Sequence, residues 1–331
     1  MKKAAIIASA LVFLSTSLLL ALSYHNLSKN FDIEEAIIFE VKKGASNKSI
    51  FQGLHDNNLI SLPQIHTIAF KILKKFNSDL FFKSGEYQIN NSDNYFSSLR
   101  KMLKGEVFLR RYTIAEGQTV AEVVELLNNS PYFTGEIKDI PEEGSILPET
   151  YFYKKGDDRA NQLKIMQNDL EKTLNEAWAQ RKDNLPLKNK RELLILASIV
   201  EKETGLDPER DHIAGVFINR LNKGMRLQSD PTVIYAVTMG KYKLERPLSR
   251  RDLRNTSKFN TYTNYGLPPT PIANPGKLAI FATAQPLETK DLYFVSDGRG
   301  KHRFSKTLTE HNKNVSLLRK YEREQKAKQN K

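Results

Sequence analysis

The sequence predicts an α+β fold, because short strand-like runs alternate with helical patterns along most of its length. Residues 39–41 and 84–90 have strand character, and each is followed by apolar residues at helical spacing. A chain of 331 residues is long enough for two or three domains. With 40% hydrophobic and 27% charged residues, the composition is that of a globular protein. We therefore expect several folded units of mixed helix and strand.

The first residues predict a membrane anchor. Lys2 and Lys3 precede an uncharged apolar run, residues 4–22, and about 19 residues suffice to cross a hydrocarbon core as a helix. Positive residues stay in the cytoplasm, so the rest of the chain lies on the far side of the membrane. A cleaved signal peptide is the alternative, with small residues at 21–23. We favour the anchor because the run exceeds the ~7–15 residues of a signal's apolar region.

The net charge of +13 has two interpretations. A basic surface attracts polyanions, which outside the cytoplasm are wall polymers or anionic lipids. Alternatively, much of the excess belongs to a solvated tail, because residues 318–331 are highly charged and end without a capping signal. We favour the tail.

The sequence lacks the residues or motifs that several classes of chemistry require. There is no cysteine, which excludes disulfides, thiolate catalysis and cysteine-ligated metals. The phosphate-binding, nucleophile-elbow, zinc-protease and dinucleotide motifs are absent. His302 and His311 lack metal-ligand spacing, and aromatic residues do not interleave with basic ones as nucleic-acid binding requires. We expect no cofactor, no metal and no nucleic acid.

A strand, turn and helix pattern occurs twice. In the first copy the turn is at Gly44, and a helix capped by Ser46 or Asn47 ends near residues 57 and 58. A weaker copy has its strand at 112–114 and its turn at Gly117. The predicted buried residues are Ile50, Phe51 and Leu54 in the first copy, and Val120, Val123, Val124 and Leu127 in the second.

Further helices are predicted between and after these copies. Residues 91–106 form a helix with Phe96, Leu99 and Leu103 inward and Gly105 just past its end. The pattern loosens over residues 135–157, and a long helix follows at 161–180. Its apolar residues at helical spacing are Leu163, Met166, Leu170 and Leu174.

The next predicted helix begins near residue 189 or 190 and contains the sequence LILASIVEKETG. Two glutamates, Glu201 and Glu203, lie at its end. At 100° per residue, Glu203 falls on the apolar stripe with Leu196 and Ile199. Glu201 falls on the less apolar side, as a solvent-facing or supporting group. Burial raises the pKa of a carboxyl group, as general-acid chemistry at neutral pH requires. The alternative is that Glu203 forms an ion pair with Arg220 or Arg226.

A group of polar residues beyond this helix is typical of sugar binding, because amides both donate and accept hydrogen bonds. Asp230 and Asn274 could instead form turns, since each precedes a proline. The candidate substrate-binding residues are Asn219, Gln228, Asp230, Asn260, Tyr262 and Asn274.

The chain resembles the endolytic murein transglycosylases of the MltG (YceG-like) type. The resemblance rests on LASIVEKET, VFINRLNKGMRLQSDPTVIY, NTYTNYGLPPTPIANPG and LYFVSDGRGKHRFS, which occur in this order. Lytic transglycosylases typically carry a catalytic glutamate followed by Ser or Thr, which matches Glu203 and Thr204. In PEEGSILPETYFY, Glu149 stands where relatives often carry Asp.

The resemblance implies a domain organisation. Residues 1–3 are a cytoplasmic end, 4–23 the membrane anchor, 24–110 a LysM-like module and 111–190 a connecting subdomain. Residues 191–318 are the catalytic domain, of mixed α/β structure with the catalytic acid at the end of a helix, and 319–331 a basic tail.

The resemblance also implies an activity on peptidoglycan at the cytoplasmic (inner) membrane, with the bulk of the chain on its periplasmic side. Glu203 cleaves the β-1,4 bond between N-acetylmuramic acid and N-acetylglucosamine, and a 1,6-anhydro ring forms without water. Penicillin-binding proteins and other wall synthases are the implied partners. Two alternatives stay open: a hydrolytic muramidase in which Asp230 or Glu201 activates water, and a non-catalytic peptidoglycan-binding scaffold.

Overall fold

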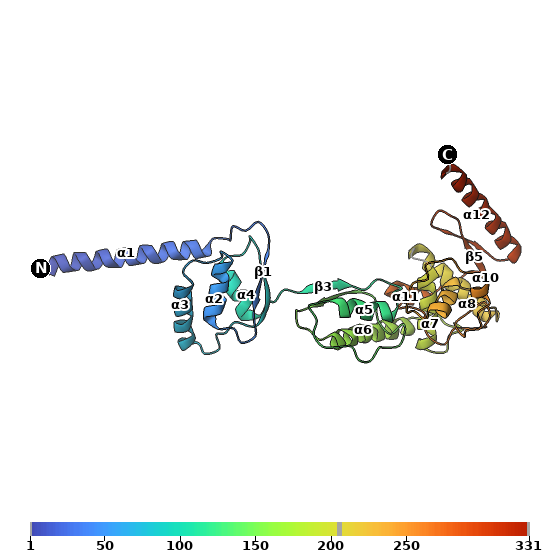
Figure 1. Ribbon diagram of the computed structural model, residues 1–331, viewed down its shortest axis with the longest axis horizontal. Coiled ribbons are helices and arrows are strands. Elements are labelled where there is room, and N and C mark those ends of the chain that lie inside the picture. Colours follow the sequence, from blue (N-terminus) through green and yellow to red (C-terminus); the bar gives the residue numbers. More distant parts are fainter. Residues whose placement is uncertain (1, 204–206, 330–331) are drawn as a thin grey trace. The chain divides into compact units, whose positions relative to one another are not determined.

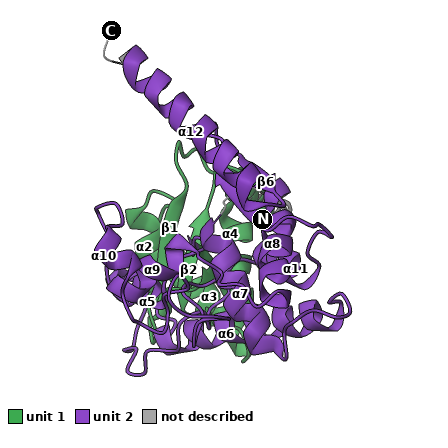
Figure 2. Cartoon of the chain, turned by 90° about the vertical axis from the view of Figure 1, so that its right-hand side faces the viewer, with its two compact units in different colours: residues 1–110, 152–155 green, residues 111–151, 156–331 purple. Residues whose placement is uncertain are grey.

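The computed structural model describes residues 2–203 and 207–329 and confirms an α+β protein. The chain divides into two compact units (Figure 2). Unit 1 comprises residues 1–110 and 152–155, and unit 2 comprises residues 111–151 and 156–331. Apart from residues 152–155, the ranges 111–190 and 191–318 both lie within unit 2.

The chain begins with helix α1 (Lys2–Ser28), drawn at the N-terminal end in Figure 1. Its last turns contact unit 1: the Tyr24 ring lies 5.6 Å from that of Phe96, and the Asn94 amide donates to the Ser28 carbonyl. No helix in the described part of the chain has both the length and the apolar character needed to cross a membrane. In the predicted anchor, the side chains of residues 4–11 and 20 lie outside the described set.

Besides α1, unit 1 contains an antiparallel strand pair and three helices. Strands β1 (Ile37–Val41) and β2 (Gly85–Ile89) pair with Phe39 opposite Tyr87. Helices α2 (Asn47–Asp56) and α3 (Pro63–Phe76) connect these strands, and α4 (Tyr95–Lys104) follows them. Ser46 caps α2 as predicted, because its hydroxyl accepts the Ser49 amide hydrogen. The predicted buried residues of α2, Ile50, Phe51 and Leu54, are all in the core.

The prediction that Phe96 of α4 lies in the core is wrong. Phe96 is 41% exposed and contacts Tyr24, whereas Met102 is fully buried. The face that meets the core centres on Ser98 and Met102, and Leu99 and Leu103 pack beside it. The sequence pattern favoured Phe96 because it weighs side-chain size, and Ser98 does not register as a core residue.

The second strand and helix pattern occurs at the start of unit 2. Strand β3 (Arg110–Thr113) pairs with β4 (Thr150–Tyr153), and helix α5 (Val120–Asn129) buries all four predicted apolar residues. Thr119 and Glu122 form a capping box at the start of α5. Helix α6 (Arg159–Ala179) confirms the predicted long helix, with its four leucine and methionine positions buried.

Helix α7 (Lys190–Glu203) is the centre of unit 2 and packs against α6, α8, α9 and α11 (Figure 1). Residues 195–201 of this helix are all buried, with Leu196, Ile199 and Val200 inaccessible to solvent. The remaining elements are the 3-10 helix η1 (Asp207–Glu209) and helices α8 (Arg210–Asn222), α9 (Asp230–Thr238), α10 (Arg250–Leu253) and α11 (Lys277–Ala284), followed by the hairpin β5 (Tyr293–Ser296) and β6 (His302–Ser305) and helix α12 (Leu308–Gln329).

Candidate active site

Glu203 is the last residue of α7 and is partly buried. Its carboxylate oxygen Oε1 accepts a hydrogen bond of 2.6 Å from the Ser229 hydroxyl. Ser229 is almost fully buried and occupies the N-cap position of α9. An N-cap serine usually bonds its own helix. Here no such cap bond forms, and the hydroxyl is directed to Glu203 instead.

A network of hydroxyl groups fixes Ser229 in place. Its backbone N–H donates to the Thr261 hydroxyl at 3.0 Å, and its carbonyl accepts from the Thr232 hydroxyl at 2.6 Å. The two threonine hydroxyls lie 2.8 Å apart, and both residues are buried. Buried polar networks that are fully hydrogen-bonded are rigid, so Ser229 meets Glu203 in a fixed geometry.

The surroundings raise the pKa of Glu203 to about 7. Burial is the largest cause, because it disfavours the charged carboxylate. The Ser229 hydrogen bond lowers the pKa, the negative charge of Asp230 raises it, and the positive charge of Arg220 lowers it. A carboxyl group with a pKa near neutrality can both donate and accept a proton at physiological pH.

Arg220 and Asp230 supply the charges beside Glu203. Arg220 is buried, and its guanidinium donates to the carbonyls of Leu292 and Leu227, both at 2.6 Å. Asp230 is exposed, and its carboxylate accepts a 2.6 Å hydrogen bond from the Tyr262 hydroxyl. Asp230 and Tyr262 are thus the predicted binding residues that the fold brings to Glu203.

Glu201 is buried and binds the backbone at the start of α11. Its Oε2 accepts the Gly276 amide hydrogen at 2.9 Å, and its Oε1 lies 3.7 Å from the buried Arg210 guanidinium. Arg210 also pairs with Glu116 at 3.3 Å. Of the two positions that the sequence allows for Glu201, the solvent-facing one is therefore wrong and the supporting one fits.

Three of the other predicted binding residues use their side chains within the protein, and the fourth is exposed. The Asn219 amide donates to the carbonyls of Thr289 and Asp291, and the Asn260 amide to those of Leu253 and Asn255. The Asn274 side chain accepts from Ile146 and donates to Gln118. Gln228 is exposed and has a φ of 50°, an uncommon conformation for a non-glycine residue.

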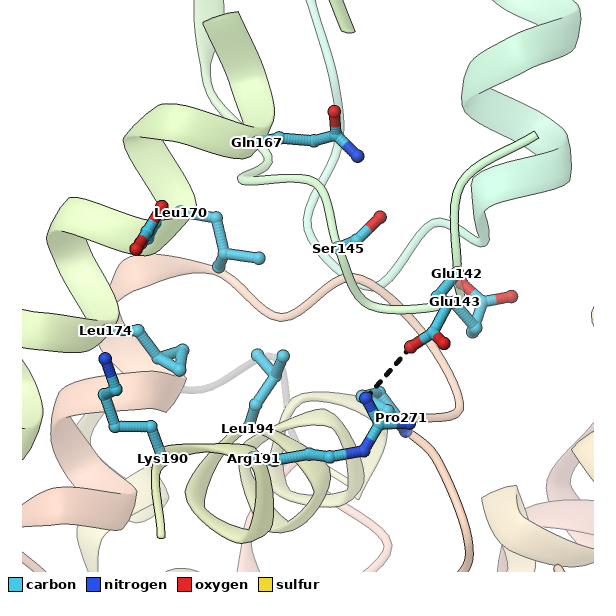
Figure 3. A pocket seen from close by; sticks show the side chains of 11 residues that line it. Glu142, Glu143, Ser145, Gln167, Leu170, Leu174, Lys190, Arg191, Leu194 and Pro271 are labelled. Atoms are coloured by element: carbon cyan, nitrogen blue, oxygen red, sulfur yellow. Dashed lines mark hydrogen bonds and ion pairs between the residues drawn. The ribbon is translucent and has the colours of Figure 1, made fainter. Parts of the chain in front are cut away.

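Two pockets of unit 2 are lined in part by residues of α7, and Glu203 lines neither of them. One, of about 440 Å3, is lined by Lys202, Pro231 and Tyr235, the first two of which adjoin Glu203 and Asp230 in sequence. The other, of about 350 Å3, is seen in Figure 3. Leucine side chains line it, and an ion pair of 2.9 Å between Arg191 and Glu142 crosses its edge. The first adjoins the acid and is the better candidate for a substrate subsite.

Sequence reasoning placed Glu203 on the apolar face at the end of its helix but missed the hydroxyl that donates to it. Ser229 lies 26 residues further along the chain, and its only local signal is an N-cap position before Asp230 and Pro231. Thr204, the second residue of the predicted Glu-Thr pair, lies outside the described residues. Within residues 2–203 and 207–329, no cluster of three or more His, Asp or Glu side chains could hold a metal ion.

The site thus combines a carboxyl group of near-neutral pKa with a hydroxyl that donates to it, and a guanidinium and a second carboxylate affect that pKa. The chain belongs to the YceG-like family, whose sequence pattern matches residues 39–317.

Relatives of known name have similar sequences. The endolytic murein transglycosylase of Bacillus subtilis (strain 168) is 30% identical over 314 residues, which cover 85% of this chain and 84% of the relative. That of Streptococcus pneumoniae (strain D39) is 28% identical over 76% of this chain, which spans about half (53%) of that longer relative. A crystal structure described as a yceG-like protein from Listeria monocytogenes is 28% identical, with a TM-score of 0.51, over 85% of this chain and 99% of that one.

Proposed function

We propose that this protein is an endolytic peptidoglycan lytic transglycosylase whose single catalytic acid is Glu203. The observation that carries the proposal is the pKa of Glu203, raised to about 7 at the end of a buried helix. Membership of the YceG-like family and the printed activity of the Bacillus and Streptococcus relatives support the same reaction class.

In the proposed reaction, protonated Glu203 donates its proton to the oxygen that links N-acetylmuramic acid to N-acetylglucosamine. The bond from the muramyl C1 to that oxygen breaks, and the N-acetylglucosamine leaves with the proton. The Glu203 carboxylate then takes the proton of the muramyl C6 hydroxyl, whose oxygen bonds to C1 and closes a 1,6-anhydro ring. Glu203 ends protonated, as it began, and no water is consumed. The Ser229 hydroxyl stabilises the carboxylate between the two steps.

A hydrolytic muramidase is the second candidate, because Asp230 lies close enough to raise the pKa of Glu203. Hydrolysing enzymes use a second carboxylate as nucleophile or as activator of water. Glu201 does not suit that role, since its carboxylate is buried and occupied by Gly276 and Arg210. Asp230, which is exposed, is the residue that hydrolysis would require.

Digestion of purified glycan strands in H2(18)O separates these candidates by mass spectrometry. Transglycosylation gives internal anhydromuramyl ends without 18O, whereas hydrolysis gives reducing ends that carry it. We expect anhydro ends from the wild type, none from Glu203→Gln, and normal cleavage from Glu176→Gln, a matched change on the exposed surface of α6. Reducing ends labelled with 18O would refute the proposal, and binding without cleavage by the wild type would favour a scaffold.

The proposal includes attachment to the cytoplasmic membrane through residues 4–23. Lys2, Lys3 and the uncharged run after them support an orientation in which the chain beyond residue 23 lies outside the cytoplasm. Residues 24–110 would act as a LysM-like glycan-binding module, and wall synthases such as penicillin-binding proteins would be partners. Resistance of the full chain to alkaline extraction from membranes, with protease access only from outside, tests this placement.

A further inference from the structure

Helix α3 exposes a row of large apolar side chains. Phe70 and Pro63 are its only buried residues, and they face unit 1. On the opposite side, Ile65 and Phe76 are 59% and 86% exposed. The apolar face of α3 comprises Ile65, Ile68, Ile72, Leu73 and Phe76. Contiguous exposed apolar side chains on a soluble unit mark a site of interaction with protein or membrane.

The charge of α3 narrows the choice of partner. Its sequence, PQIHTIAFKILKKF, has three lysines and no acidic residue. Lys71 and Lys75 lie on one flank of the apolar face, by helical spacing, and Lys74 lies further round. Helices with an apolar face and flanking lysines bind in the plane of membranes that contain anionic lipids.

The position of α3 within unit 1 agrees with this partner. Helix α1 meets α4 of the same unit through Tyr24 and Phe96, and α3 stands at the side of the unit from which α1 extends (Figure 1). It runs across the direction of α1. A bilayer crossed by α1 would therefore meet α3 along its length.

We infer that the apolar face of α3 docks onto the anionic surface of the bilayer that α1 crosses. This inference rests on the membrane attachment proposed above, and it adds a second point of contact. Ile65, Ile68, Ile72 and Phe76 enter the boundary between headgroups and acyl chains, while Lys71 and Lys75 meet lipid phosphates. Two contacts fix the orientation of unit 1 on the membrane, which a single helix would leave free.

The absence of cysteine makes a direct test available, because one introduced cysteine is labelled uniquely. The full chain carrying I72C and an environment-sensitive fluorophore is reconstituted in vesicles of phosphatidylcholine with or without phosphatidylglycerol. The matched control is I38C, an exposed isoleucine on β1 of the same unit. We expect the label at position 72 to shift its emission to shorter wavelength in the anionic vesicles and to be quenched by lipid-borne quenchers. The label at position 38 should stay accessible to iodide.

Lysine variants and alkaline extraction test the α3 contact and the membrane anchor separately. K71Q and K75Q together should reverse most of the emission shift if lysines hold α3 on anionic lipid. A label at position 72 that stays as accessible to iodide as that at 38, or that becomes shielded only when a wall-synthesis protein is added, overturns the inference. If the full chain resists alkaline extraction in that case, the anchor stands and only the α3 contact is refuted. A chain that is extracted yet still buries the label at 72 keeps the α3 contact and refutes the anchor.

Discussion

The hydrogen bond from Ser229 to Glu203 makes a prediction about the pH dependence of cleavage. Ser229→Ala removes a donor that lies 2.6 Å from the carboxylate. Hydrogen bonds to a charged group contribute about 1.5–3 kcal/mol, and those between neutral groups about 0.5–1.5 kcal/mol. The loss therefore falls mainly on the ionised form of Glu203, by roughly 1.4 kcal/mol, which corresponds to about one pH unit.

Because Glu203 must be protonated to act first, kcat/KM falls as pH rises through its pKa of about 7. Ser229→Ala should move this alkaline limb of the pH profile of kcat/KM to higher pH, by about one pH unit. The assay is release of soluble muropeptides from glycan strands between pH 5 and 9. Ser229→Thr keeps the hydroxyl and should keep the limb close to that of the wild type. A limb that stays in place or moves downward in Ser229→Ala would refute the reasoning, since it would mean that the hydroxyl does not stabilise the carboxylate.

Three further predictions concern the charges at the site. Asp230→Asn removes a negative charge that raises the pKa of Glu203, so the alkaline limb should move downward in the same assay; complete loss of cleavage would instead support hydrolysis through Asp230. Glu203→Gln should stabilise the protein at pH 8 by up to about 3 kcal/mol and not at pH 4, measured by denaturant unfolding. The pKa of Glu203 is 4.5 in the unfolded chain and about 7 in the folded protein, so the wild type loses stability as pH rises from 4.5 to about 7. A difference in unfolding free energy between Glu203→Gln and the wild type that is the same at pH 4 and pH 8 would contradict this. Glu201→Gln should lower the free energy of unfolding by about 1–3 kcal/mol without changing the product, because Arg210 loses a buried partner; an unchanged unfolding midpoint would contradict it.

Local periodicity was sufficient to predict much of the architecture and the position of Glu203. The spacing of Leu196, Ile199 and Glu203 on one helix face is a property of neighbouring residues, and so is the Ser46 cap of α2. Long helices and capped helix starts are therefore readable without tertiary information.

Residues whose roles depend on tertiary contacts could not be predicted in this way. Ser229 reaches Glu203 only because α7 and α9 pack together. Asn260 and Asn274 have side chains suited to binding sugar, yet both are fully buried and bonded to backbone groups. A sequence gives the chemistry of an amide but not whether solvent or the protein interior surrounds it.

Asn274 has a consequence for the modularity of this protein. Its backbone exchanges hydrogen bonds with Gly117 and Gln118, and its side chain bonds to Gln118 and Ile146. One buried residue of the loop before α11 thus joins that loop to two stretches, around Gln118 and Ile146, each more than 100 residues away from it in sequence. The segment that follows β3 cannot be exchanged between relatives as an independent cassette, and a chimera that replaces it must bring the matching loop around Asn274 as well.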